Sequence, residues 1–294
     1  MADAFAAATA RPRVVLVPAL LGLAGLAWVA LLAWEASDLA HAMHVPALGA
    51  PALACERGSP AGRAALYLGG WLLMSVAMML PTTLPLVRVF ARLVQRRPQR
   101  GLLLALLLGG YLLAWLAFGA VAHALHAALG AWKDGTGWLW THAWVPAAAT
   151  LALAGAFQFS RLKHRCLTAC RSPAAFVAGR WGGVAPRRDA LRIGVAHGVF
   201  CVGCCWALML LMFTAGLGNV AWMLVLGLVM AIEKNASWGR RVGAPLGVAL
   251  LAAAAAVAIA ALAPPVVPRA EPTLSRADAS PAADRSFRAW PAGR

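Results

Sequence analysis

Uncharged apolar runs dominate this sequence and restrict the folds open to it. The longest lies between Arg192 and Glu233, where no Asp, Glu, Lys or Arg occurs. As one helix this run of about 40 residues would be roughly 60 Å long, about twice the thickness of a bilayer's hydrocarbon core. It therefore predicts two membrane-spanning helices joined by a tight turn, for which Gly216, Gly218 and Asn219 are suitable residues.

The composition leads to the same fold class. Hydrophobic residues make up 62% of the chain and charged residues only 12%, whereas soluble domains carry about 25% charged residues. A soluble fold could not bury this much apolar surface, but a bilayer can surround it. We expect an all-α, polytopic transmembrane helix bundle of about seven spans. The expected spans are residues 14–34, the runs 63–88, 100–133 and 134–161, two helices within 192–233, and 242–263.

The distribution of basic residues predicts the orientation. A net charge of +16 could indicate a nucleic-acid-binding protein, but the basic residues cluster in short links between apolar runs. More than two thirds of the 26 Lys and Arg residues precede the first span or follow the second, fourth and sixth. The positive-inside rule then places residues 1–13 in the cytoplasm. We expect residues 14–263 to form the membrane domain of a bacterial inner (plasma) membrane protein, and residues 264–294 to form a disordered external tail. We also expect the lipid bilayer as a partner, and no nucleic acid.

The fifth expected span carries the most distinctive side chains. At about 100° per residue, His197, Cys201, Cys204, Cys205 and Met212 share one face of a helix. Thiolate, thioether and imidazole groups are the ligands that suit Cu(I) and similar soft ions. The alternative is that these cysteines act as small apolar residues in helix packing.

Methionines line two further spans. Met74 and Met78 share a face of the second span, and Met223 and Met230 share a face of the sixth. They could add thioether ligands to the cysteine face, although methionine is also a common core residue. Pro81 predicts a kink in the second span, because proline removes a backbone donor.

An acidic residue lies within the sixth span. Glu233 falls in the expected inner leaflet, where an ionisable group is usually functional. Its expected partners are a metal ion, His197, an Arg of the inner loop or Lys234 of a neighbouring chain. The alternative places Glu233 in cytoplasmic water beyond the end of the helix.

A second pair of thiols lies in the inner loop. Cys166 and Cys170 are four residues apart and would share one face of a helix. We expect the neighbouring Arg and Lys residues to lower the pKa of these thiols and favour metal-binding thiolates. Two free cytosolic thiols are the alternative.

Histidines recur at the expected outer side. His41 and His44 follow the first span, and His123 and His126 lie at the outer end of the third. Each pair has a spacing of three residues, which predicts a metal uptake site formed by all four. Separate interfacial histidines are the alternative.

Three blocks of this sequence carry a family resemblance. They are Trp71 to Pro81; Phe157, Gln158, Lys163, Cys166 to Arg171 and Pro173; and Gly194, His197, Cys201, Gly203 to Met209, Asn219, Trp222, Met223, Glu233 and Lys234. In these blocks the chain resembles the bacterial family of predicted metal-binding integral membrane proteins catalogued as domain of unknown function 2182. The resemblance covers about residues 64–240 and implies a membrane protein that binds metal.

These features favour a protein that handles metal over an enzyme. Walker, dinucleotide-binding, nucleophile-elbow and zinc-protease motifs do not occur. We expect Cu(I) to be bound or transferred, with a soluble metal chaperone or another membrane subunit as partner. Two alternatives are a thiol redox protein that uses Cys201, Cys204 and Cys205, and a structural subunit of a membrane complex.

Overall fold

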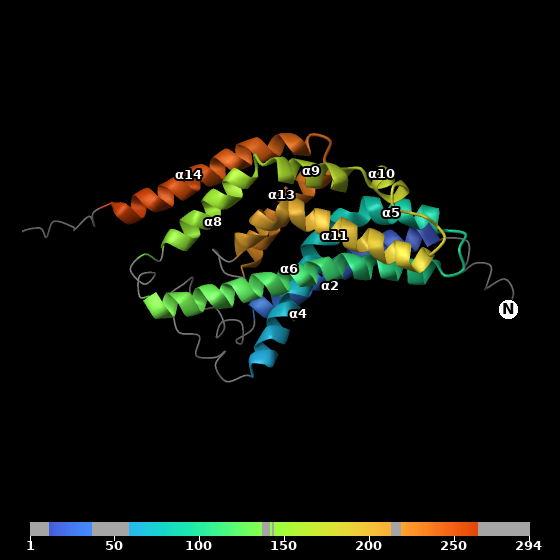
Figure 1. Ribbon diagram of the computed structural model, residues 1–294, viewed down its shortest axis with the longest axis horizontal. Helices are drawn as coiled ribbons and strands as arrows, with labels where there is room; N and C mark the ends of the chain where they lie inside the picture. The colour runs from blue at the N-terminus through green and yellow to red at the C-terminus, as the bar shows by residue number, and fades with distance from the viewer. Residues whose placement is uncertain (1–11, 37–58, 137–141, 143, 213–218, 264–294) are drawn as a thin grey trace, which may run out of the picture. The chain divides into compact units, whose positions relative to one another are not determined.

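The computed structural model describes residues 12–36, 59–136, 142, 144–212 and 219–263, and within them every regular element is a helix (Figure 1). The expected all-α class is therefore confirmed. The helices are α2 (Pro12–Glu35), α4 (Pro60–Met79), η1 (Pro81–Thr83), α5 (Leu84–Leu93), α6 (Arg100–Thr136), α8 (Trp144–Phe157), α9 (Arg161–Arg171), α10 (Pro173–Ala178), α11 (Pro186–Leu210), α13 (Val220–Asn235), η2 (Gly239–Val242) and α14 (Gly243–Leu262).

The second expected span is broken where the sequence predicted a kink. Helix α4 ends at Met79, and the chain continues through η1 into α5 with a bend of 46°. Because Pro81 interrupts the helical hydrogen bonds, the Met79 carbonyl accepts from Thr82 Oγ1 at 2.8 Å and from Tyr111 Oη at 3.2 Å. The break thus binds α4 to α6 and places the end of α4 in the protein interior.

Helices α6 and α11 lie side by side over much of their length (Figure 1). Two glycines allow this approach, as small residues do between membrane helices. A Cβ atom on Gly194 would overlap the backbone of Leu107, and one on Gly198 would lie 2.6 Å from Ala114 Cβ. The cysteine face of α11 is therefore held close to α6.

Helix α9 is a short amphipathic helix that packs across α11. Ser160 caps its first turn by accepting from Lys163 N at 3.1 Å, and Pro173 begins the next helix. A Cβ atom on Gly203 would lie 2.7 Å from Cys166 Sγ. Glycine at this position of α11 therefore lets the thiols of α9 approach those of α11.

Four described helices, namely α2, α6, α11 and the η2–α14 segment, are long and apolar enough to cross a membrane. The bent pair α4–α5 would be a fifth. Helices α8 and α13 are shorter than expected for full spans, with 14 and 16 residues, so the expected number of seven spans stays a prediction. The long uncharged run does divide into two helices, and Asn219 caps α13 by accepting from Trp222 N at 2.9 Å. Gly216 and Gly218 lie outside the described residues.

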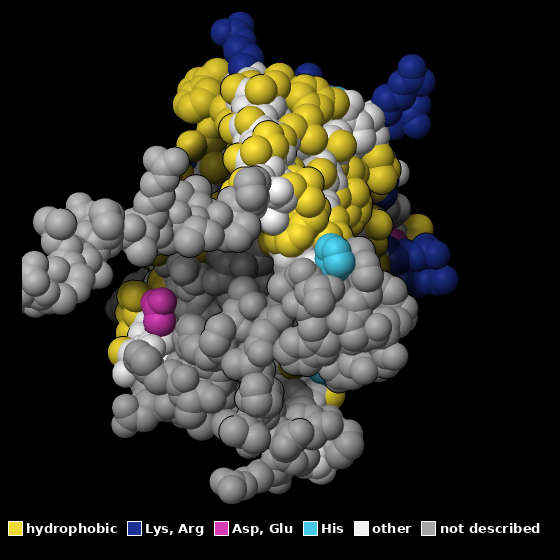
Figure 2. All heavy atoms as spheres, turned by 90° about the vertical axis from the view of Figure 1, so that its left-hand side faces the viewer, with side chains coloured by type: hydrophobic (Ala, Val, Ile, Leu, Met, Phe, Trp, Pro, Cys, Tyr) yellow, Lys and Arg dark blue, Asp and Glu magenta, His cyan; other side chains and the backbone are white. Residues whose placement is uncertain are grey.

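The surface of the described helices is apolar. Hydrophobic side chains make up most of the described surface in Figure 2, and Lys and Arg side chains stand out at its margins. Large exposed side chains include Leu26 of α2, Val121 of α6, Val199 of α11, Leu228 of α13 and Ile259 of α14. Contiguous apolar surface of this kind is compatible with membrane insertion.

The basic links meet one another. The Arg97 guanidinium lies 5.4 Å from the centre of a Trp181 ring, which joins the link after α5 to the link before α11. Arg240 donates to Thr168 Oγ1 at 3.1 Å, which joins the link after α13 to α9. The links after α5 and before α11 therefore lie together, and so do α9 and the link after α13.

Candidate metal centre

Three buried thiols lie on α11. Cys201, Cys204 and Cys205 are all almost fully buried and belong to one core cluster. The thiols of Cys204 and Cys205 each donate to the Cys201 carbonyl at 3.0 Å. The sequence predicted that these cysteines share one face of a helix, and the structure orients all three toward the interior.

Two more thiols reach this cluster from α9. Cys166 is buried and Cys170 partly buried, and Cys170 lies within hydrogen-bonding range of Cys201 and Cys204. These hydrogen bonds, together with burial, raise the pKa of the Cys170 thiol well above its ordinary value. Burial and the nearby Cys204 thiol raise the pKa of Cys166.

The expectation that basic neighbours lower these two pKa values is therefore wrong. Arg161 and Arg165 of α9 are exposed, so water screens their charges. Cys166, by contrast, lies on the side of α9 that packs on α11. Loss of water around a thiol disfavours the charged thiolate, and here that effect outweighs the distant positive charges.

A lysine and a methionine complete the sulfur cluster. Both belong to the blocks that carry the family resemblance, but the sequence did not predict their contact with the cysteines. The Lys234 Nζ lies 2.9 Å from Cys201 Sγ, 3.9 Å from Cys205 Sγ and 3.5 Å from the Met79 Sδ. Met79 is fully buried, because the break after α4 turns the helix end inward. Tyr111 Oη also contacts Cys201 Sγ at 3.2 Å.

His197 lies one helical turn before Cys201. Its ring packs between those of Tyr111 and Phe176, with centroid distances of 5.9 and 5.4 Å. The side chain is buried, and its Nδ1 atom has no hydrogen-bond partner among the described residues. A buried imidazole nitrogen without a hydrogen-bond partner is unusual, and this nitrogen is available to coordinate a metal ion.

The predicted methionines also join the cysteines. Each of them is buried, and all belong to the core cluster that contains Cys201. Contacts between Met78 and Gly227 hold α4 against α13. The methionines in this cluster are Met74, Met78, Met79, Met209, Met212, Met223 and Met230.

Glu233 is bound by a lysine. Both of its carboxylate oxygens accept from Lys163 Nζ, at 2.7 and 2.8 Å, and both side chains are almost fully buried. Lys163 also donates to Gln158 Oε1. Lys163 was not among the partners expected for Glu233, which were a metal ion, His197, an Arg of the inner loop or Lys234 of a neighbouring chain. It binds the carboxylate because α9 crosses near the end of α13 and supplies the cation. The signal that could have revealed it was the block carrying the family resemblance, which contains both Gln158 and Lys163.

The expected outer histidine site stays a prediction. His41 and His44 lie outside the described residues, as does the side chain of His126. The His123 ring packs at a tilt of 34° against the ring of Tyr67, with a centroid distance of 4.5 Å.

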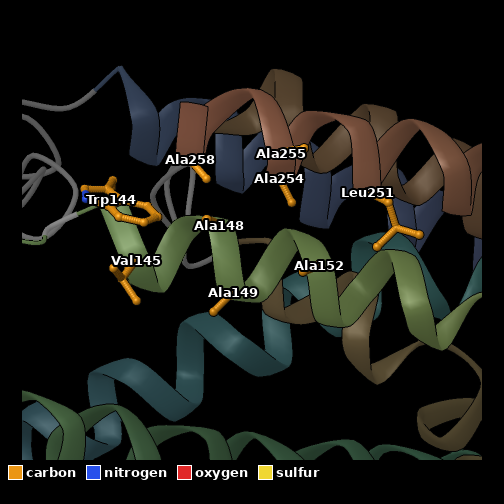
Figure 3. A pocket seen from close by; sticks show the side chains of 9 residues that line it. All are labelled: Trp144, Val145, Ala148, Ala149, Ala152, Leu251, Ala254, Ala255 and Ala258. Carbon is orange, nitrogen blue, oxygen red and sulfur yellow. The ribbon is translucent and has the colours of Figure 1, made fainter. Parts of the chain in front are cut away.

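The open groove between α8 and α14 offers no ligands. It is lined wholly by apolar side chains (Figure 3), namely Trp144, Val145, Ala148, Ala149, Ala152, Leu251, Ala254, Ala255 and Ala258. Within the described part of the chain, no three His, Cys, Asp or Glu side chains are already arranged to hold a metal ion. In the sulfur cluster the Cys204 and Cys205 thiols donate to the Cys201 carbonyl, and the Lys234 amine contacts Cys201 Sγ.

The comparison with protein families gives one match. Residues 68–257 match the family model described as "PpoB2: Copper chaperone". The matched region runs from α4 into α14 and contains every residue of the sulfur cluster. No curated protein and no solved structure matched the chain. The match agrees with the metal-binding character that the resemblance implied. The designation as domain of unknown function 2182 and insertion in a membrane stay predictions.

Proposed function

Because the chain belongs to the PpoB2 copper chaperone family, we propose that it is an integral membrane protein that binds Cu(I) at the sulfur cluster and passes it on. Family membership supports copper handling. The oxidation state, the ligands and the membrane location are our proposals. The sulfur cluster supports the first two, and the long apolar helices support the third.

The observation that carries the proposal is the convergence of sulfur atoms from three helices. Cys201, Cys204 and Cys205 come from α11, Cys170 comes from α9 and Met79 comes from α4. Thiolate and thioether sulfur are soft ligands, which favour Cu(I) over harder ions. His197, with its unpartnered Nδ1, is a further candidate ligand.

A membrane location is supported by the long apolar helices and by the exposed hydrophobic side chains. We propose the inner membrane of a bacterial cell, with the basic links and residues 1–13 in the cytoplasm. In this orientation Cys166 and Cys170 are the thiols on the cytoplasmic side, since α9 belongs to one of the basic links. They could exchange Cu(I) with a soluble metal chaperone or another membrane subunit.

The buried methionines provide weaker ligands next to the cysteines. Thioethers bind Cu(I) without carrying charge, so they can hold the ion briefly and release it. Movement through a protein requires such sites, because an ion bound too tightly does not leave. Met74, Met78, Met223 and Met230 are therefore candidate transfer sites, and His41, His44, His123 and His126 are candidate uptake sites. Glu233 is not part of the proposed site, because Lys163 already neutralises it.

Copper binding by the purified protein tests this proposal. Detergent-purified wild-type protein is titrated with Cu(I) against a chromophoric Cu(I) chelator. We expect a high-affinity site that the Cys201→Ser/Cys204→Ser/Cys205→Ser variant lacks. Cys55→Ser is the matched control, since Cys55 precedes residues 68–257, which match the family model, and this variant should bind as the wild type does. Equal Cu(I) affinity in the triple variant and the wild type would disprove the proposal.

A further inference from the structure

Lys234 is the charged side chain inside the sulfur cluster. The groups facing its amine are the thiols of Cys201, Cys204 and Cys205, the thioether of Met79 and the phenol of Tyr111. The adjacent Glu233 does not serve as its counter-ion, because both carboxylate oxygens bind Lys163. The Lys234 ammonium thus has sulfur neighbours where a buried lysine would ordinarily have a carboxylate.

A buried lysine of this kind is costly to retain. Moving an ammonium group out of water is unfavourable unless a partner compensates its charge. Ionisable side chains at such positions in membrane proteins usually have a function. A fixed positive charge beside sulfur ligands also stabilises a negatively charged metal–thiolate complex.

The charges of the cluster can be counted. We take the contact between Lys234 Nζ and Cys201 Sγ, at 2.9 Å, as an ammonium beside a thiolate, a pair that is neutral overall. A Cu(I) ion held by two thiolates forms a complex with one negative charge. A Lys234 ammonium beside this complex restores neutrality, whereas a divalent ion on the same two thiolates would leave one uncompensated positive charge.

We propose that Lys234 determines the specificity of the site, because its fixed positive charge favours a monovalent ion on Cys201 and Cys205 and disfavours a divalent one. This inference rests on the proposed function. In the binding step, Cu⁺ forms bonds to the sulfurs of Cys201 and Cys205. The Cys205 thiol releases its proton to solvent, and Lys234 keeps its proton and remains an ammonium. One positive charge enters and one leaves, so the net charge of the buried cluster is unchanged.

The effect of the Lys234 charge on metal preference should be large, because the cluster is buried. Water therefore screens the charges of the cluster weakly, and an uncompensated charge is unfavourable. The Lys234 amine is already within 4 Å of both sulfurs, so no new approach is needed. Met79 Sδ, at 3.5 Å from the amine, is positioned as a neutral third ligand and leaves this charge count unchanged.

The test compares the affinities of the detergent-purified full chain for Cu(I) and Zn(II), each measured by chelator competition. We expect Lys234→Met to lower the ratio of Cu(I) to Zn(II) affinity by at least about tenfold, because charges close together in a buried site interact strongly. Lys234→Arg keeps the charge and should keep the ratio within about threefold of the wild type. Arg241→Met removes an exposed positive charge near the same end of α13 and serves as the control, with an unchanged ratio.

Lys234→Gln is the second neutral variant, in case Lys234→Met does not fold, and the same fall is expected. The melting temperature of each variant without metal shows whether the substitution destabilises the fold, which distinguishes a loss of stability from a change in metal specificity. A merely structural lysine would lower the melting temperature and weaken both metals equally, which overturns the inference. An unchanged or increased ratio in a folded neutral variant also overturns it. If wild-type Cu(I) binding does not depend on the α11 cysteines, the proposed function and this inference both fail. If it does but the ratio is unchanged, only the inference fails.

Discussion

Glu233 of α13 receives two hydrogen bonds from Lys163 of α9, at 2.7 and 2.8 Å, across 70 positions of sequence. This buried ion pair fixes α9 against the end of α13. Arg171 strengthens the connection by donating to the Glu233 carbonyl at 2.6 Å. Because α9 carries Cys166 and Cys170, the pair also positions two thiols of the candidate metal centre.

Breaking this pair should destabilise the protein. Glu233→Gln leaves the Lys163 charge buried without its counter-ion, so we expect a loss of about 3 kcal/mol in the free energy of unfolding. Chemical denaturation in detergent measures it. The Lys163→Met/Glu233→Leu double variant should recover much of the loss, because an apolar pair can replace a buried ion pair. Glu35→Gln, at a weaker contact of 3.4 Å to Val220 N, should cost less than about 1 kcal/mol. A stable Glu233→Gln single variant would contradict this role.

Gly194 should tolerate no side chain. In Gly194→Ala the added Cβ would overlap the backbone of Leu107, so α6 and α11 must separate. We expect a loss of at least about 2 kcal/mol, within the range of overpacked cores. Gly109→Ala, on the same pair of helices but with no atom near the added Cβ, should be neutral or slightly stabilising. Similar melting temperatures for the two variants would show that the helices do not pack as described.

The thiols of α9 should react as poorly ionised groups. The thiolate is the reactive form, and the pKa values of Cys166 and Cys170 are raised above an ordinary value of 9.0. Their alkylation rates should therefore still be rising at pH 9, because only a small fraction is deprotonated below that pH. Peptide-resolved mass spectrometry after brief iodoacetamide treatment measures each rate. A plateau below pH 8 would indicate thiolates at neutral pH and contradict this description.

The links after α5 and before α11 should face the same side of the membrane. Arg97 and Trp181 are in contact, so reporters fused after Arg97 and after Arg180 should both indicate the cytoplasm. A reporter fused after Lys133, at the far end of α6, or in the tail should indicate the outside. Opposite signals from the Arg97 and Arg180 fusions would refute this topology.

The sequence predicted the elements of the fold better than the contacts of the site. Uncharged runs located the long helices because a bilayer requires apolar stretches of fixed length, and helical periodicity grouped Cys201, Cys204 and Cys205 correctly. Periodicity describes one helix at a time, however. It could not show that the break at Pro81 brings Met79 to Lys234, or that α9 supplies Lys163 to Glu233. Such contacts depend on tertiary packing, which a helical wheel does not contain.

The most direct test of the central claim is X-ray absorption spectroscopy at the copper edge on the detergent-purified protein loaded with one equivalent of Cu(I). We expect a Cu(I) ion of low coordination number with about two or three sulfur ligands, since thiolates and thioethers suit Cu(I). The same sulfur signal should be absent from the Cys201→Ser/Cys204→Ser/Cys205→Ser variant and present in Cys55→Ser. A first shell of nitrogen and oxygen in the wild type, or an unchanged sulfur shell in the triple variant, would contradict the account.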